Sequence, residues 1–69
     1  MTETASLSHR ERAVLASFAR GHTYLQISRR LGITVATVDT YMRRVRAKTG
    51  AVNTAELVRL GLQLEWPVV

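Results

Sequence analysis

Apolar residues recur at helical spacing in four segments of the chain, and each segment is bounded by residues that start or stop helices. The apolar positions that share one face in the first segment are Val14, Leu15, Phe18 and Ala19. Ser8 and Glu11 precede them as a capping box, in which each side chain bonds a backbone N–H at the helix start. Together these signals predict a helix over residues 9–20 that Gly21 ends.

The second segment is short and begins with the same signal. Thr23 and Gln26 form another capping box, which predicts a helix of about two turns over residues 24–31. Such a helix persists only when it packs against a neighbour. Gly32 follows it as the expected left-handed turn residue, and we expect Ile33 to be buried.

The remaining two segments are longer. Thr34 is the predicted N-cap of a third helix over residues 35–49, which Gly50 closes. Asn53 is the predicted N-cap of a fourth, over residues 54–64. A tight turn between the second and third helices is the arrangement of a helix-turn-helix, in which the second helix of the motif enters the major groove of DNA.

Four helices and no strand predict an all-α fold, a four-helix domain with a central helix-turn-helix. We expect a flexible lead-in at residues 1–6, the domain at 7–65 and a short tail at 66–69. A chain of 69 residues has room for one domain with a small core.

Composition excludes several classes of function. The chain has no cysteine, and His9 and His22 stand alone, so we expect no metal site and no cofactor. There are no paired carboxylates, no nucleophile motif and no phosphate-binding loop, which argues against an enzyme and a small-molecule ligand. No apolar run approaches the roughly 20 residues of a membrane span, so we expect a cytoplasmic protein.

The positive charge is concentrated in the middle of the chain. The whole net charge of +5 lies between residues 29 and 48, while cations and acids balance outside that window. The cations of the window are Arg29, Arg30, Arg43, Arg44, Arg46 and Lys48, against the single acid Asp39. This distribution indicates either a solvated basic face or a site for a polyanion.

At 100° per residue the third helix divides into two faces. The inward stripe contains Val38, Met42, Val45 and Thr49. The outward stripe contains Ala36, Thr40, Arg43 and Ala47, with Asp39 beside it. Small residues allow close approach to DNA, and an arginine there can pair with guanine O6 and N7.

The other flank of the helix combines hydroxyl groups and cations, which suit phosphate contacts. The N-terminus of the second helix offers free amides to a further phosphate. The residues that we expect to contact the DNA backbone are Thr23, Tyr24, Thr34, Thr37, Tyr41, Arg44 and Lys48.

Four groups of residues, taken in register, carry a resemblance to a known family. They are Leu7, Ser8, Arg10, Glu11, Val14 and Leu15; Gly21, Ile27, Ser28 and Leu31; Thr34, Thr37 and Val38; and Lys48, Gly50, Asn53, Glu56, Leu57 and Val58. Over residues 7–62 the chain thus resembles the LuxR-type (GerE) DNA-binding domain of bacterial transcription regulators. The resemblance implies sequence-specific binding to double-stranded DNA, with base contacts from Asp39, Thr40 and Arg43.

The sequence departs from the family pattern at two positions of the third helix. Asp39 stands where relatives often have Lys, so it either accepts from cytosine N4 or pairs with Arg43 one turn later; we favour the ion pair. Tyr41 stands where relatives usually have His, and a phenol can still donate to phosphate.

The fourth helix and the tail raise the question of partners. Leu57, Val58 and Gly61 suit its core face, whereas Leu60, Leu64, Trp66, Val68 and Val69 carry more apolar surface than a monomer needs. The resemblance implies a homodimer on DNA through this helix, and we expect contacts from Leu57, Leu60, Gly61 and Leu64.

Two alternatives remain open. Trp66 can instead fold back over the core. The third helix also resembles region 4 of bacterial sigma factors, and the chain could be a protein-interaction module that contacts RNA polymerase or another regulator. The capped fourth helix favours the LuxR type. We expect such a regulator to act at the bacterial nucleoid.

Overall fold

The computed structural model describes residues 6–65, so the expectations for residues 1–5 and for the tail with Trp66, Val68 and Val69 lie outside it. Its four helices are α1 His9–Ala19, α2 Tyr24–Leu31, α3 Val35–Thr49 and α4 Thr54–Glu65. No strand occurs within the described residues, and the all-α, four-helix prediction is confirmed. The ends of α1 and α4 each differ from the predicted end by one residue.

The predicted N-caps are present and explain where the helices begin. Ser8 Oγ accepts from Glu11 N at 3.1 Å, and Ser8 N donates to Glu11 Oε1 at 2.8 Å. Thr23 and Gln26 form the same reciprocal pair, at 3.1 and 2.8 Å. At α4, Asn53 Oδ1 accepts a backbone N–H of the first turn at 2.9 Å. Each start is therefore fixed by a local hydrogen bond.

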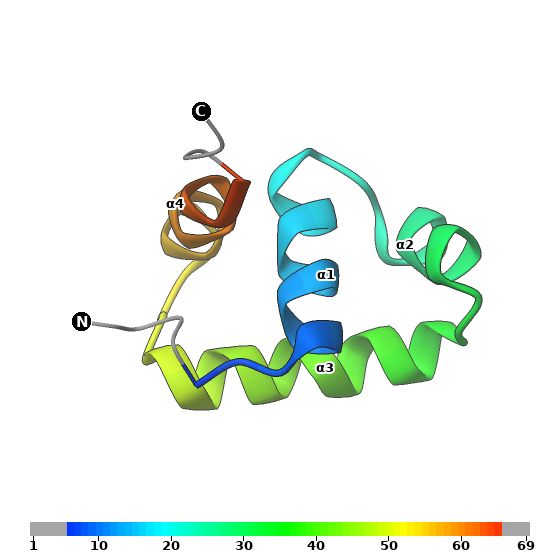
Figure 1. Ribbon diagram of the computed structural model, residues 1–69, viewed down its shortest axis with the longest axis horizontal. Coiled ribbons are helices and arrows are strands. Elements are labelled where there is room, and N and C mark those ends of the chain that lie inside the picture. Colours follow the sequence, from blue (N-terminus) through cyan, green and yellow to red (C-terminus); the bar gives the residue numbers. More distant parts are fainter. Residues whose placement is uncertain (1–5, 66–69) are drawn as a thin grey trace.

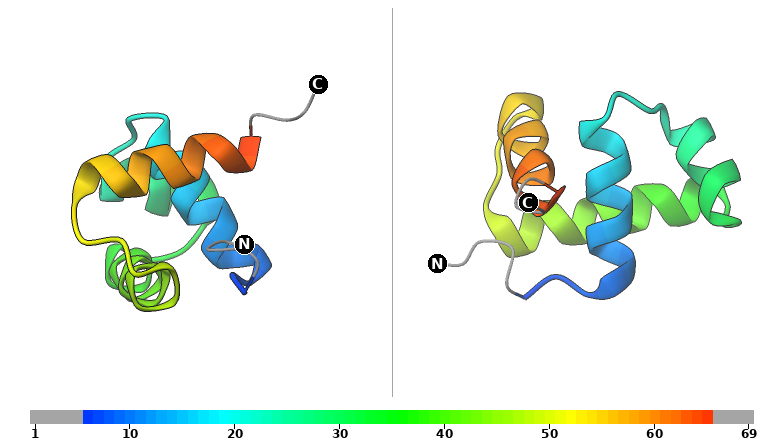
Figure 2. Two further views of the ribbon diagram at one scale, coloured as in Figure 1. Left: turned by 90° about the vertical axis from the view of Figure 1, so that its left-hand side faces the viewer. Right: turned by 45° about the horizontal axis from the view of Figure 1, so that its top comes forward.

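The longest helix, α3, forms the base of the molecule, and α1 stands across its middle (Figure 1). Figure 2 shows α2 beside the N-terminal half of α3 and α4 beside α1 at the opposite end. Helix α1 thus packs against each of the other three helices. The fully buried side chains between them are Val14, Leu15, Ile27, Val38, Met42, Val45, Leu57 and Leu60.

The turn between α2 and α3 depends on a left-handed residue. Gly32 has φ 71° and ψ 34°, and its N–H closes the end of α2 on Ser28 O. Ile33 N also donates to Ser28 O, at 3.0 Å, and Ile33 is half-buried against the core. The turn thus places α3 directly after α2, as the sequence predicts for a helix-turn-helix.

Helix α4 turns the expected Leu57 and Gly61 to the core and buries Leu60 in addition. The expectation that Leu60 carries surplus apolar surface is wrong, because Leu60 is as buried as Leu57, each 1% exposed. Gly61 lies directly against α1: a Cβ there would fall 2.5 Å from Ala19 Cβ and 2.7 Å from Leu15 O. The glycine allows α1 and α4 to approach closely within one chain.

Candidate nucleic-acid interface

The two faces of α3 are those that its sequence predicts. Val38, Met42 and Val45 are fully buried against the other helices. The opposite, outward face is exposed along its whole length and consists of Ala36, Thr40, Arg43 and Ala47. Since the inward stripe fixes the rotation of the helix, it also fixes which side chains the helix presents to a ligand.

The first turn of α3 is held by two threonines. Thr34 Oγ1 accepts from Thr37 N at 3.0 Å and lies 2.9 Å from Thr37 Oγ1. Only one of the two hydroxyl groups donates its proton in this pair, so the proton of the other hydroxyl is not used there. The N-cap can therefore stabilise the helix and still offer one O–H group to a phosphate.

An ion pair stands in the middle of the outward face. Arg43 Nη2 lies 2.9 Å from Asp39 Oδ2, one turn earlier, and the two side chains are 75% and 40% exposed. This contact confirms the favoured interpretation of Asp39 in the protein without DNA. It leaves this part of the face close to neutral.

Thr40, beside that pair, uses its hydroxyl within the helix. Thr40 Oγ1 donates to Ala36 O at 3.1 Å. The hydroxyl can then accept a hydrogen bond from a base but cannot donate one. Its methyl group, together with the Ala36 methyl, leaves an apolar surface that suits the C5 methyl of thymine.

On the flank, Tyr41 and Arg44 form a unit. The guanidinium carbon of Arg44 lies 5.8 Å from the centroid of the Tyr41 ring, within the range of a cation–π contact. Tyr41 is half-buried against the core, whereas Arg44 is exposed. The ring thus provides a fixed platform for a cation on the predicted phosphate side.

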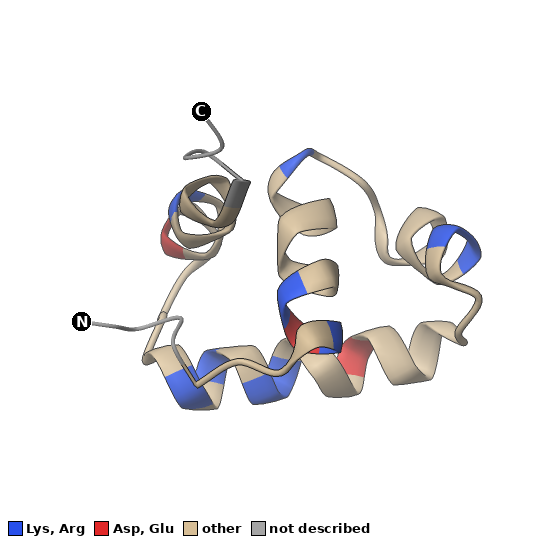
Figure 3. Cartoon of the chain, viewed as in Figure 1, with Lys and Arg blue, Asp and Glu red and all other residues tan. Residues whose placement is uncertain are grey.

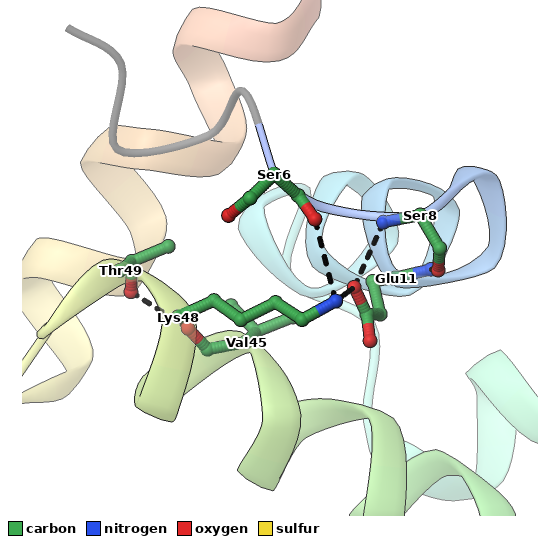
Figure 4. Close-up of polar contacts among 6 residues, drawn as sticks. All are labelled: Ser6, Ser8, Glu11, Val45, Lys48 and Thr49. Carbon is green, nitrogen blue, oxygen red and sulfur yellow. Dashed lines mark hydrogen bonds and ion pairs between the residues drawn. The ribbon is translucent and has the colours of Figure 1, made fainter.

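Lys48, predicted as a contact to the DNA backbone, already has partners within the protein although its side chain is 38% exposed, and its contact with phosphate stays a prediction. Its Nζ donates to Glu11 Oε1 at 2.8 Å and to Ser6 O at 3.3 Å (Figure 4). The Glu11 side chain is only 3% exposed. The hydrogen bond from Lys48, followed by that from the Ser8 backbone, holds the pKa of Glu11 below its usual value near 4.5.

This contact changes the distribution of available charge. Lysine and arginine gather on the C-terminal half of α3 and near the end of α2 (Figure 3). Lys48 and Arg43 already face carboxylates, so the exposed cations of α3 outside these ion pairs are Arg44 and Arg46. Arg46 was not among the predicted DNA contacts, although its position near Asp39 on the helical wheel indicates a second cationic flank.

The N-terminus of α2 carries two of the predicted backbone contacts. Thr23 is exposed as the N-cap, with its hydroxyl accepting from the third residue of the helix. Tyr24 is half-buried, and its ring meets Phe18 edge-on with centroids 6.3 Å apart. Tyr24 therefore anchors α2 to α1, while the first amides of the helix remain at the surface end.

The four residues predicted for a dimer contact are mostly internal. Leu57, Leu60 and Gly61 are buried in the contact with α1, so their correct role is packing within the chain. Leu64 is half-buried at the edge of the core. The large apolar residue that α4 exposes is Leu62, at 49%, and it was not among the predicted dimer contacts.

Other kinds of site are not found in residues 6–65. This part of the chain has no pocket and no cluster of three histidine or acidic residues that could hold a metal ion. None of its helices has the length and apolarity needed to cross a membrane. The exposed face of α3 is the feature that remains to be explained.

Comparison with known proteins shows the family to which the chain belongs. Residues 5–61 match the family model described as bacterial regulatory proteins, luxR family. The chain is 42% identical over 59 residues to the transcriptional activator protein YukR of Yersinia ruckeri, covering 86% of this chain and 26% of that protein. It is 43% identical over 56 residues to the HTH-type transcriptional activator RamA of Corynebacterium glutamicum, covering 81% and 20%.

A third relative is the C4-dicarboxylate transport transcriptional regulatory protein DctR of Rhodobacter capsulatus, 48% identical over 50 residues, with 72% of this chain and 25% of that protein covered. No solved structure gives a significant match. The chain spans about a quarter of the length of these curated relatives. The chain therefore belongs to the luxR family of bacterial regulatory proteins, and it carries the helix-turn-helix DNA-binding domain of these transcription regulators.

Proposed function

We propose that the protein binds specific sites on double-stranded DNA by inserting α3 into the major groove, and that it regulates transcription from these sites. The observation that carries this proposal is the outward face of α3, where small side chains surround one arginine. The major groove is about 12 Å wide and admits a helix whose exposed face lacks bulky groups. Arg43 is then the residue suited to guanine O6 and N7.

The surroundings of this face support the proposal. Arg44 on its Tyr41 platform and the hydroxyls of the first turn of α3 lie on one flank, where phosphate contacts set the register of a helix in the groove. Arg46 extends the cationic surface to the opposite flank. The first amides of α2, near Thr23, are a further phosphate contact of the kind that helix N-termini provide.

We further propose that the protein acts as a homodimer on DNA, at the bacterial nucleoid. Because Leu57, Leu60 and Gly61 are internal, a partner helix would meet the exposed face of α4 with Leu62 and the edge at Leu64. A two-fold dimer requires two half-sites about 10 bp apart, or a multiple of that spacing.

Salt dependence separates DNA binding from a protein-interaction role. Each phosphate that a cation neutralises contributes about −0.9 to the slope of log K against log salt. The exposed arginines of α2 and α3 would make two to four such contacts, which gives a slope between about −2 and −4 per domain. Fluorescence anisotropy with labelled duplexes measures it, and absence of binding at low salt would favour the interaction module.

Specific readout requires a second measurement. Bound sequences are first selected from random duplexes, and each base pair of the selected site is then changed in turn. Arg43→Ala should cost about 1–3 kcal/mol at one base position and relax the preference there. Arg44→Ala removes the same charge but should weaken all sequences alike. Equal loss on selected and random DNA for Arg43→Ala would contradict the assignment of Arg43 to a base.

A further inference from the structure

An acid on the surface that meets DNA requires an explanation, because phosphates repel it. Asp39 lies beside the outward face of α3 and is the one acid of that helix. Its carboxylate is 40% exposed and bonds Arg43 at 2.9 Å. A surface pair at this spacing contributes only about 0.3–0.5 kcal/mol to helix stability, so stability alone is a weak reason for an acid at this position.

The geometry of the pair is compatible with guanine. A guanidinium has five N–H donors in a rigid fork. Asp39 Oδ2 engages Nη2, so a second proton on Nη2 and the protons of Nη1 remain for O6 and N7 of a guanine. Arg43 can therefore meet its base without leaving Asp39.

The pair is much less compatible with phosphate. On a random sequence the arginine has no matching guanine and would contact the backbone, where each neutralised phosphate strengthens non-specific binding. With Asp39 attached, the pair brings almost no net charge to a phosphate, and the carboxylate is itself repelled. Arg43 must break the ion pair to contribute there.

We propose that Asp39 is a specificity-determining residue that acts through Arg43: it holds the guanidinium ready for guanine and withholds its charge from phosphates. This inference rests on the proposed function. It assigns Asp39 a positioning role instead of the direct base contact that the family resemblance implies. Asp39 then raises specificity by weakening the complexes with random DNA, because specificity is the difference between the affinities for the selected site and for other sequences.

The test compares Asp39→Asn with wild type on a selected site and on random duplex of equal length. At about 0.1 M salt, release of Arg43 should raise the affinity for random DNA about 5- to 10-fold and steepen its salt slope by about 0.9. The affinity for the selected site should change by less than about twofold, so the specificity ratio falls. In an Arg43→Ala background, Asp39→Asn should raise the affinity for random DNA only by removing the repulsion of the carboxylate, and it should not steepen the salt slope, because no arginine is released.

Two controls make the outcomes distinct. Glu56→Gln changes the net charge by the same amount on α4, and Gln can keep the bond to Val52 N. If Asp39→Asn raises both affinities equally and no more than Glu56→Gln does, only net charge is at work and the inference is overturned. If it weakens the selected site at a cytosine and leaves random DNA unchanged, Asp39 is a direct base contact. If wild type binds no duplex at low salt, the proposed function itself fails.

Discussion

At the scale of single residues, the hydroxyl and the methyl group of Thr40 have different roles on the outward face of α3. In Thr40 the hydroxyl is occupied by Ala36 O and the methyl is free. Two substitutions of similar size distinguish these groups, since valine keeps the methyl without the hydroxyl and serine keeps the hydroxyl without the methyl.

We expect Thr40→Val to bind a selected site about as tightly as wild type, and Thr40→Ser to bind about 3- to 10-fold more weakly, as a lost apolar contact of one methyl group implies. Replacing the contacted thymine by deoxyuridine should weaken wild type by a similar factor and Thr40→Ser no further. Affinities are measured by anisotropy on the same duplex series. Loss of binding by Thr40→Val would show instead that the hydroxyl accepts a bond from a base.

The residue scale also shows which site contacts a sequence can predict. The Asp39–Arg43 pair and the faces of α3 follow from helical geometry, because residues four apart lie on the same side of one helix. The role of Lys48 could not be obtained in this way. Its partner Glu11 lies 37 positions earlier, and the two meet only because α1 crosses α3.

At the scale of helices, the Glu11–Lys48 contact joins the start of α1 to the last turn of α3. Glu11 Oε1 accepts a hydrogen bond from Ser8 N, which caps α1, and the same oxygen accepts a hydrogen bond from the ammonium group of Lys48. The pKa of Glu11 is therefore lower in the folded than in the unfolded chain. The stabilising effect is fully present above the unfolded value near 4.5 and is lost as pH falls through the folded value.

Lys48→Met should lower the free energy of unfolding at pH 7 by about 2–3 kcal/mol, because it leaves a buried carboxylate without its cation. Since the Lys48 side chain is partly exposed, this loss is smaller than the roughly 3–5 kcal/mol for breaking a fully buried pair. Glu11→Gln should cost less, about 1–2 kcal/mol, and should reduce the loss of stability that occurs as the pH falls below about 4.5. Urea unfolding followed by circular dichroism measures both. A Lys48→Met protein with wild-type stability and weakened DNA binding would show that Lys48 contacts phosphate and does not stabilise the fold.

Helix α4 provides a second test at this scale. By helix propensity alone, Gly61→Ala should stabilise the protein by about 0.5–1 kcal/mol. The added Cβ would instead lie within 2.7 Å of both Ala19 Cβ and Leu15 O, neither of which can move without its backbone. We expect a net destabilisation of about 1–3 kcal/mol, as overpacking usually causes.

Urea denaturation of Gly61→Ala gives the sign directly, and exposed Gln63→Ala on the same helix should change stability by less than about 0.5 kcal/mol. Adding Ala19→Gly should restore only part of the loss, since the contact with Leu15 O remains. A stabilised Gly61→Ala protein would show that α1 and α4 separate at little cost.

Helix α4 also marks the limit of the sequence analysis. Its boundaries and cap were predictable because they depend on local hydrogen bonds. Its inward face was not fully predictable, because leucines and valines occur on several sides and periodicity leaves more than one rotation open. The approach to α1 at Gly61 selects the rotation that buries Leu57 and Leu60.

At the scale of the whole molecule, binding as a dimer depends on apolar surface that remains exposed after the chain has folded. A core of eight fully buried side chains accounts for the apolar residues between the helices, and Leu62 of α4 remains outside it at 49% exposure. A second copy of the chain related by two-fold symmetry would place this residue opposite its equivalent or near it. An aspartate there would put like charges into the contact.

Leu62→Asp should therefore weaken binding to a duplex with two half-sites about 10 bp apart by at least about tenfold, while leaving the affinity for an isolated half-site within about twofold. The isolated half-site is the internal control, because it measures how far the added charge of one domain repels DNA when no dimer contact is present. Anisotropy titrations and the stoichiometry of the complex measure the two effects. Equal affinities on both duplexes for wild type and variant would mean that each domain binds alone, and that the exposed leucine has no partner in DNA binding.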